Sequence, residues 1–230
     1  MTELRPFAEL GAADHGWLNA RHHFSFASYQ NPNRMNWGSI RVWNDDIIAP
    51  GTGFAPHGHE DMEIITYVRS GAITHKDSLG NEGRTEAGDV QVMSAGTGVR
   101  HSEFNHEAVP TTLFQIWIIP RETGGAPSWG ARPFPKDARS GKWAVLASGF
   151  EGDEALPIRA DARVLGATLA KGSVLTHDVG EGRHAYLVPA TGAVSVNGVA
   201  VNARDGVALS EGVHRIEASE EAELVLVDAA

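Results

Sequence analysis

Residues 51–63 read Gly-Thr-Gly-Phe-Ala-Pro-His-Gly-His-Glu-Asp-Met-Glu, with His57 and His59 two positions apart in a glycine-rich segment. A second pair with the same spacing follows further along the chain, where His101 and Glu103 lie in Gly-Thr-Gly-Val-Arg-His-Ser-Glu. Residues two apart on an extended strand point to the same face. Two adjacent strands would therefore direct three imidazoles and one carboxylate into a single cavity.

The composition favours the same kind of site. The chain has 230 residues, with 11 histidines and no cysteine, so disulfides, cysteine zinc sites and a cysteine nucleophile are excluded. Any metal must bind nitrogen and oxygen atoms, and three imidazoles with one carboxylate suit Fe(II), Mn, Co, Ni, Cu or Zn. An ion that prefers five or six ligands would keep positions open for a substrate. From side-chain parity alone, Glu63 competes with Glu103 as the carboxylate ligand.

The other histidines carry weaker signals. His22 and His23 precede an aromatic run, and we expect them to pack near the site without binding the metal. The histidines without a paired partner are expected to have ordinary structural roles: His15, His75, His106, His177, His184 and His214.

Charge narrows the choice of partner. Lysine and arginine number 19 against 29 acidic residues, which gives a formal net charge of −10. This balance argues against direct binding to nucleic acid or to an anionic membrane, so a small molecule or another protein is the expected partner. No stretch approaches the roughly 20 apolar residues of a membrane helix. The first residues lack a signal-peptide pattern, and we expect a soluble cytoplasmic protein.

Short apolar segments separated by glycine and proline predict an all-β fold with little helix, the one helical candidate lying near Ala8–Ala13. Asn197-Gly198 predicts a type I′ turn within a hairpin over Ala193–Asn202. The strand candidates are Ile40–Trp43, Met62–Val68, Val90–Ser94, Thr112–Ile119, Trp143–Ala147, Ala185–Val188, Ala193–Val196, Val199–Asn202 and Glu223–Val227.

Two halves are expected on either side of a Gly/Pro-rich connector at Arg121–Gly141, which is long enough to pack along one of them. A faint repeat relates the halves, because Glu63 precedes Gly71 by the same eight residues that separate His184 from Gly192. Two matching β units predict a duplicated barrel. We place the domains at residues 1–130 and 131–230.

Three segments together resemble the pirin family, whose members are two-domain cupins: RHHFSFASY at 21–29, PHGHEDMEIITYV at 56–68 and GDVQVMSAGTGVRHSEFN at 88–105. GAVSVNGVAVN at 192–202 resembles a second cupin hairpin. The resemblance implies two tandem jelly-roll-type β-barrels, with the metal site in the first. The second barrel is expected to lack an equivalent metal, because Asp178 and Gly180 stand where the repeat would need histidines.

Carried over by position, the pirin metal ligands fall on His57, His59, His101 and Glu103, with Glu63 beside the site. The implied activity is that of a quercetin 2,3-dioxygenase, which opens a flavonol with dioxygen and releases carbon monoxide. Fe(II) is the expected ion, and Glu103 is the expected acceptor of the substrate proton. The side chains expected to enclose a planar substrate are Phe24, Phe26, Phe54 and Met93.

A second hypothesis is a regulatory protein whose metal site senses redox state and tunes a surface for a protein partner, without turnover. An open apolar cavity above the metal would favour the enzyme, and a plugged site beside an exposed apolar patch would favour partner binding. We expect a monomer, since the second barrel would occupy the surface that single-domain cupins use to dimerise.

Overall fold

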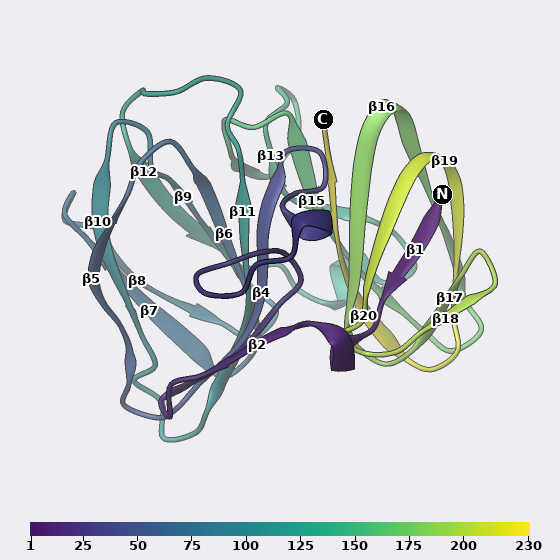
Figure 1. Cartoon of the computed structure of the whole chain (residues 1–230), viewed down its shortest axis with the longest axis horizontal. Helices are drawn as coiled ribbons and strands as arrows, with labels where there is room; N and C mark the ends of the chain where they lie inside the picture. The colour runs from purple at the N-terminus through teal and green to yellow at the C-terminus, as the bar shows by residue number, and fades with distance from the viewer.

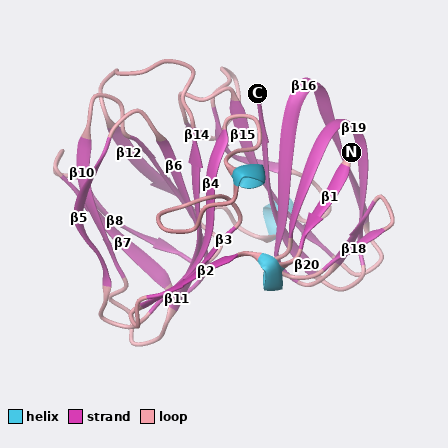
Figure 2. Ribbon diagram, viewed as in Figure 1, coloured by secondary structure: helices cyan, strands magenta, loops and turns pink.

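The computed structural model describes all 230 residues as strands, loops and three short 3-10 helices (Figure 2). The all-β prediction is confirmed, but the helix expected near Ala8–Ala13 is wrong. Only Phe7–Glu9 forms a 3-10 turn, and strand β2 (Gly11–Asp14) follows it. Pairing with β3 (Leu18–His22) overrides the helix preference of the alanines, and Gly11 is needed there because a Cβ atom would lie 2.4 Å from the Tyr29 ring.

The first domain consists of two antiparallel sheets that face each other (Figure 1). The larger has the strand order β12-β9-β6-β11-β4-β3-β2 and the smaller the order β5-β10-β7-β8. Besides β2 and β3, their bounds are β4 (Ile40–Ile48), β5 (Gly53–His59), β6 (Glu63–Ser70), β7 (Ala72–Asp77), β8 (Glu82–Glu86), β9 (Val90–Ser94), β10 (Val99–Phe104), β11 (Thr111–Ile118) and β12 (Ser128–Arg132).

The second domain is built from one strongly bent nine-stranded sheet, in the order β14-β13-β15-β20-β16-β19-β17-β18, with β1 added beside β19. Its strands are β1 (Thr2–Arg5), β13 (Ala144–Ser148), β14 (Leu156–Pro157), β15 (Ala162–Leu169), β16 (Val174–Thr191), β17 (Val194–Val196), β18 (Val199–Val201), β19 (Gly206–Ala218) and β20 (Ala222–Ala229). The predicted hairpin is confirmed as β17–β18, with positive φ at Asn197 and Gly198. Every strand candidate overlaps an observed strand.

The largest apolar core lies between the two domains. It contains 25 buried residues, among them Trp43 and Phe114 from the large sheet of the first domain and Tyr186 and Val225 from the second. A further 15 buried apolar residues fill the interior of the second domain, whereas the two clusters inside the first hold only six and four. The first domain therefore relies on its outer sheet face for packing, which leaves its interior open.

Polar contacts also join the domains. In the connector, β12 pairs with β9, so this segment packs along the first domain as expected. Near the end of the connector, the buried Arg139 donates hydrogen bonds to the Tyr67 hydroxyl at 2.9 Å and to Glu223 Oε1 at 3.0 Å. Arg139 is 0% exposed, so Glu223 compensates a charge that has no access to water. No helix in the structure has the length and apolar character needed to cross a membrane.

Candidate metal centre

The predicted histidine pairs lie on adjacent antiparallel strands, with His57 of β5 directly opposite His101 of β10. One nitrogen from each of His57, His59 and His101 lies within 4.8 Å of the others. The register shifts between His101 and Glu103, which marks a β-bulge. The spacing of the sequence pairs therefore produces a cluster of three imidazoles.

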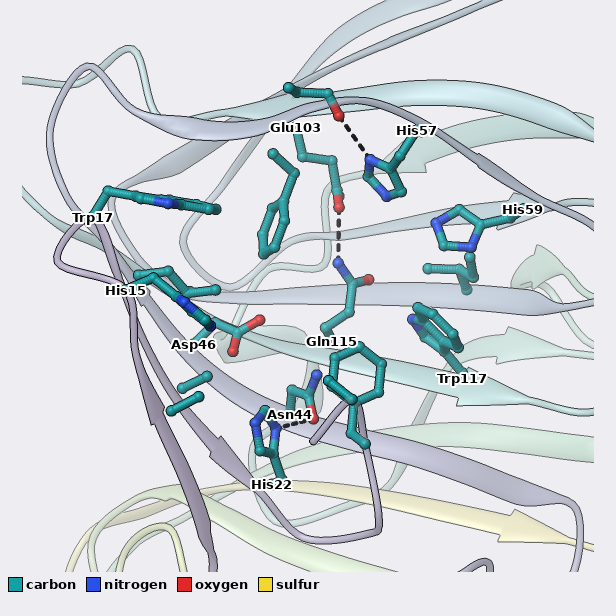
Figure 3. Close-up of a pocket in the computed structure, with 18 of the residues that line it drawn as sticks. His15, Trp17, His22, Asn44, Asp46, His57, His59, Glu103, Gln115 and Trp117 are labelled. Atoms are coloured by element: carbon teal, nitrogen blue, oxygen red, sulfur yellow. Dashed lines mark hydrogen bonds between the residues drawn. The ribbon is translucent and has the colours of Figure 1, made fainter. Parts of the chain in front are cut away.

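The hydrogen bonds of two rings direct their lone pairs inward. His57 Nδ1 lies 2.8 Å from the carbonyl oxygen of Ala55, which only accepts, so the proton is on Nδ1 and Nε2 is free (Figure 3). The Nε2 atoms of His57 and His101 lie 3.1 Å apart. Two nitrogens at about 2.1 Å from one ion and at right angles to each other would lie about 3.0 Å apart. The two nitrogens therefore have the separation that two ligands of one ion would have.

His75 holds His101 from behind, a role that the sequence did not reveal. His75 Nε2 lies 3.0 Å from Asp77 Oδ2, and His75 Nδ1 lies 3.4 Å from His101 Nδ1. Hydrogen bonds to Asn81 and His75 lower the pKa of Asp77 despite the opposing effect of partial burial. Asp77 Oδ2 accepts a hydrogen bond from His75 Nε2–H, and His75 Nδ1 accepts one from His101 Nδ1–H. His75 also stacks on Trp129, with ring centroids 4.8 Å apart.

Burial and mutual repulsion keep two of the three imidazoles, His59 and His101, neutral. Desolvation, followed by the charges of His101 and His57, lowers the pKa of His59 to about 4. Desolvation, followed by His57 and His75, lowers the pKa of His101 to about 3. Both imidazoles are therefore unprotonated at neutral pH and available to a metal.

Glu103 is 2% exposed and is held by a row of polar side chains on the large sheet. Gln91 Nε2 and Gln115 Nε2 donate to its two carboxylate oxygens at 2.6 and 2.8 Å, and Thr66 Oγ1 lies 3.2 Å from Oε1. A carboxylate oxygen of Glu103 lies within 4.8 Å of a ring nitrogen of His75 and of His101. Glu103 does not belong to the set of His57, His59 and His101 whose ligand atoms all lie within that distance. The signal for these partners was present as a polar residue flanked on both sides by apolar residues in each of three strands.

Glu63 lies on the other face of its strand, away from the histidines. Its Oε2 accepts a hydrogen bond from Ser94 at 2.6 Å, and its charged neighbour is Arg159 of the second domain. Asp61, with φ of +47°, separates β5 from β6 and breaks the alternation on which the parity argument rested. Burial raises the pKa of Glu63.

The apolar residues expected around a substrate divide into two groups. Phe26 and Phe54 line the cavity beside the histidines. Phe24 does not, because it lies in the interdomain core with its ring 5.0 Å from Tyr186. Met93 packs with Ile64, Ala95 and Val99 and also lies outside the cavity lining.

The cavity has a volume of about 520 Å³ and lies between the two sheets of the first domain. Aromatic rings form much of its wall, and His59 packs edge-on against Trp117 at 5.0 Å (Figure 3). No lysine or arginine lines it. The lining includes Trp17, Phe26, Asn44, Asp46, Phe54, Glu103, Gln115 and Trp117.

Comparison with known proteins agrees with this arrangement. The sequence model of the pirin family matches residues 3–118, and the chain is 66% identical over its whole length to the full-length "Pirin-like protein" of Caulobacter vibrioides. The chain belongs to the pirin family. Its second half, residues 145–229, matches the quercetinase C-terminal cupin domain, so this pirin has two cupin domains.

A sequence match and a structure match from Escherichia coli extend the comparison of this pirin. The "Quercetin 2,3-dioxygenase" of strain K12 is 41% identical over 99% of the chain and 98% of its own length. The crystal structure of the bacterial pirin YhhW in complex with nickel(II) superposes with a TM-score of 0.94 at 39% identity, covering 100% of this chain and 99% of the other.

Proposed function

We propose that the protein is a metal-dependent dioxygenase that opens a flavonol-like substrate and releases carbon monoxide. The observation that carries the proposal is the convergence of three imidazoles on one end of an open, aromatic-walled cavity. Relatives named quercetin 2,3-dioxygenase and a nickel-bound pirin support it. The cavity favours an enzyme over the regulatory alternative, because the three imidazoles border an open cavity with aromatic walls.

His57, His59, His101 and Glu103 would hold the ion, which we propose to be Fe(II). The residues fit such a group, because the facing lone pairs of His57 and His101 repel each other unless a cation or proton lies between them. A bound divalent ion would lower the pKa of the substrate enol hydroxyl and polarise it toward dioxygen.

The protein side chains would position the substrate and take up its proton. Trp17, Phe26, Phe54 and Trp117 offer apolar faces to a planar ring system. Glu103 would accept the enol proton at a carboxylate oxygen, and the amides of Gln91 and Gln115 would keep that carboxylate oriented.

Aerobic incubation with quercetin tests the proposal, with the protein loaded in turn with Fe, Mn, Co, Ni and Cu. We expect loss of flavonol absorbance with matching oxygen uptake in at least one metal form. The variants His57→Ala and His101→Ala should lose both the metal and the turnover. Absence of turnover with every metal would contradict the proposal, and a variant that loses metal but keeps turnover would contradict the assignment of the ligands.

A further inference from the structure

Asp46 is a buried carboxyl group without a hydrogen-bond partner for Oδ1, and it lines the cavity. The residue is 2% exposed, and its cross-strand neighbours are Ala20 on β3 and Leu113 on β11. Figure 3 shows the Asp46 carboxyl group pointing into the cavity from the side opposite His57 and His59. Burying a polar group without a hydrogen-bond partner costs free energy of folding. The apolar neighbours of Asp46 do not compensate this cost, so a structural role does not explain a carboxyl group here.

The neighbouring Asp45 shows what a structural carboxylate on the same strand looks like. Its side chain points to the opposite face, where it forms ion pairs with Arg69 and with Arg204, the latter at 2.5 Å. Because successive side chains of a strand point to opposite faces, Arg69 and Arg204 both pair with Asp45 and neither pairs with Asp46. Desolvation, followed by the negative charges of Asp45 and Glu103, raises the pKa of Asp46 well above its usual value, with Arg69 opposing.

A hydrogen-bond donor accompanies this acceptor. Asn44 lies two residues before Asp46 on the same face of β4, and its Oδ1 accepts a 2.8 Å hydrogen bond from His22 Nδ1. That contact leaves the Asn44 amide nitrogen to face the cavity, which Asn44 lines. The far end of the cavity therefore presents an acceptor and a donor side by side within otherwise aromatic walls.

We propose that Asp46 and Asn44 form a second polar subsite, which binds a phenolic hydroxyl group on the end of the substrate remote from the metal. A hydroxyl group donates one hydrogen bond and accepts others, so it matches the Asp46 carboxyl and the Asn44 amide together. This subsite selects flat aromatic compounds that carry hydroxyl groups at both ends. The inference rests on the proposed function for the metal-bound end of the substrate.

Binding of two flavonols tests the subsite without turnover, using Fe(II)-loaded protein under argon and tryptophan fluorescence as the signal. Both 3-hydroxyflavone and quercetin carry the metal-binding enol, but only quercetin has further hydroxyl groups. We expect the wild type to bind quercetin at least about tenfold more tightly than 3-hydroxyflavone. Asp46→Leu should abolish that preference and leave 3-hydroxyflavone binding unchanged, and the rim variant Ser28→Ala should keep the preference.

Other outcomes separate this inference from the proposed function. Equal affinities in the wild type, or a preference that survives in Asp46→Leu, would overturn the subsite even if quercetin is turned over. If neither flavonol binds, the flavonol proposal fails. The subsite is then tested on its own by titrating 4-methylcatechol into the metal-free protein. Saturable binding that Asp46→Leu removes would support it, and no binding would overturn it. Asp46→Asn provides an isosteric variant should the leucine variant fail to fold.

Discussion

The Nε2 atoms of His57 and His101 face each other at 3.1 Å across neighbouring strands. The Ala55 carbonyl fixes the proton of His57 on Nδ1, and His75 accepts from His101 Nδ1, so both Nε2 atoms present lone pairs. A divalent cation between them would convert this repulsion into coordination. The metal-free and metal-loaded proteins should therefore differ in stability.

Added metal should stabilise the wild type and leave His101→Ala unaffected. At a free metal concentration of 100 times Kd, binding to the folded state contributes about 2.7 kcal/mol to the free energy of unfolding. Thermal unfolding with and without metal measures this difference. His106→Ala is the matched control, because His106 is exposed and outside the cluster. An equal response of wild type and His101→Ala would contradict the assignment.

His75→Ala should weaken metal binding about 10- to 100-fold, as is usual when a ligand histidine loses its hydrogen-bond partner. The reason is that His101 would no longer be held in one tautomer by His75 and Asp77. Competition with a chelator measures the affinity. Lys76→Ala is the control, because Lys76 lies between His75 and Asp77 but has a side chain that is 56% exposed and pairs with Glu82. This variant should leave the metal affinity unchanged. Wild-type affinity in His75→Ala would show that His75 has no part in the site.

Asp46 should make the stability of the metal-free protein depend on pH in a predictable direction. Its pKa is raised by burial in the folded state, so the folded protein binds more protons than the unfolded chain above about pH 3.8. This contribution to stability is complete below that pH and is lost as pH rises toward the pKa of the folded state. Compared with Asp46→Asn, the wild type should lose stability from pH 4 upward in urea titrations. Wild-type stability that stays level or rises relative to Asp46→Asn as the pH increases would contradict the prediction.

Glu223→Ala should destabilise the protein by about 3–5 kcal/mol, because it leaves the buried Arg139 without its carboxylate. Urea unfolding followed by fluorescence measures the change. The exposed pair of Glu217 with Arg215 supplies the control, and Glu217→Ala should cost about 1 kcal/mol or less. Equal effects of the two variants would show that the interdomain network contributes little.

The strands and the histidine cluster were predictable because both depend on local alternation. His57 and His59 keep a two-residue spacing along β5, and His101 lies opposite His57 on β10, although a β-bulge separates His101 from Glu103. The supporting residues were harder to find. Thr66, Gln91 and Gln115 each lie between apolar residues of a strand, and only the register of three strands places them in one row with Glu103.

The remaining errors arise where the chain leaves regular alternation or where the domains meet. The positive φ of Asp61 turns Glu63 to the outer face of the sheet. Phe24 packs against Tyr186 of the second domain. Asp46 lies between Ala20 and Leu113 on neighbouring strands, which offer its carboxyl group no polar side chain. Such contacts join residues far apart in the sequence, so the spacing of residues within one segment cannot predict them.

The fate of labelled dioxygen tests the central claim most directly. The Fe(II)-loaded protein is mixed with quercetin under ¹⁸O₂, and the products are analysed by mass spectrometry. We predict a ring-opened product that carries both labelled oxygen atoms, together with unlabelled carbon monoxide in equal amount. Consumption of quercetin without carbon monoxide, or a product without label, would contradict a dioxygenase at the site of His57, His59 and His101.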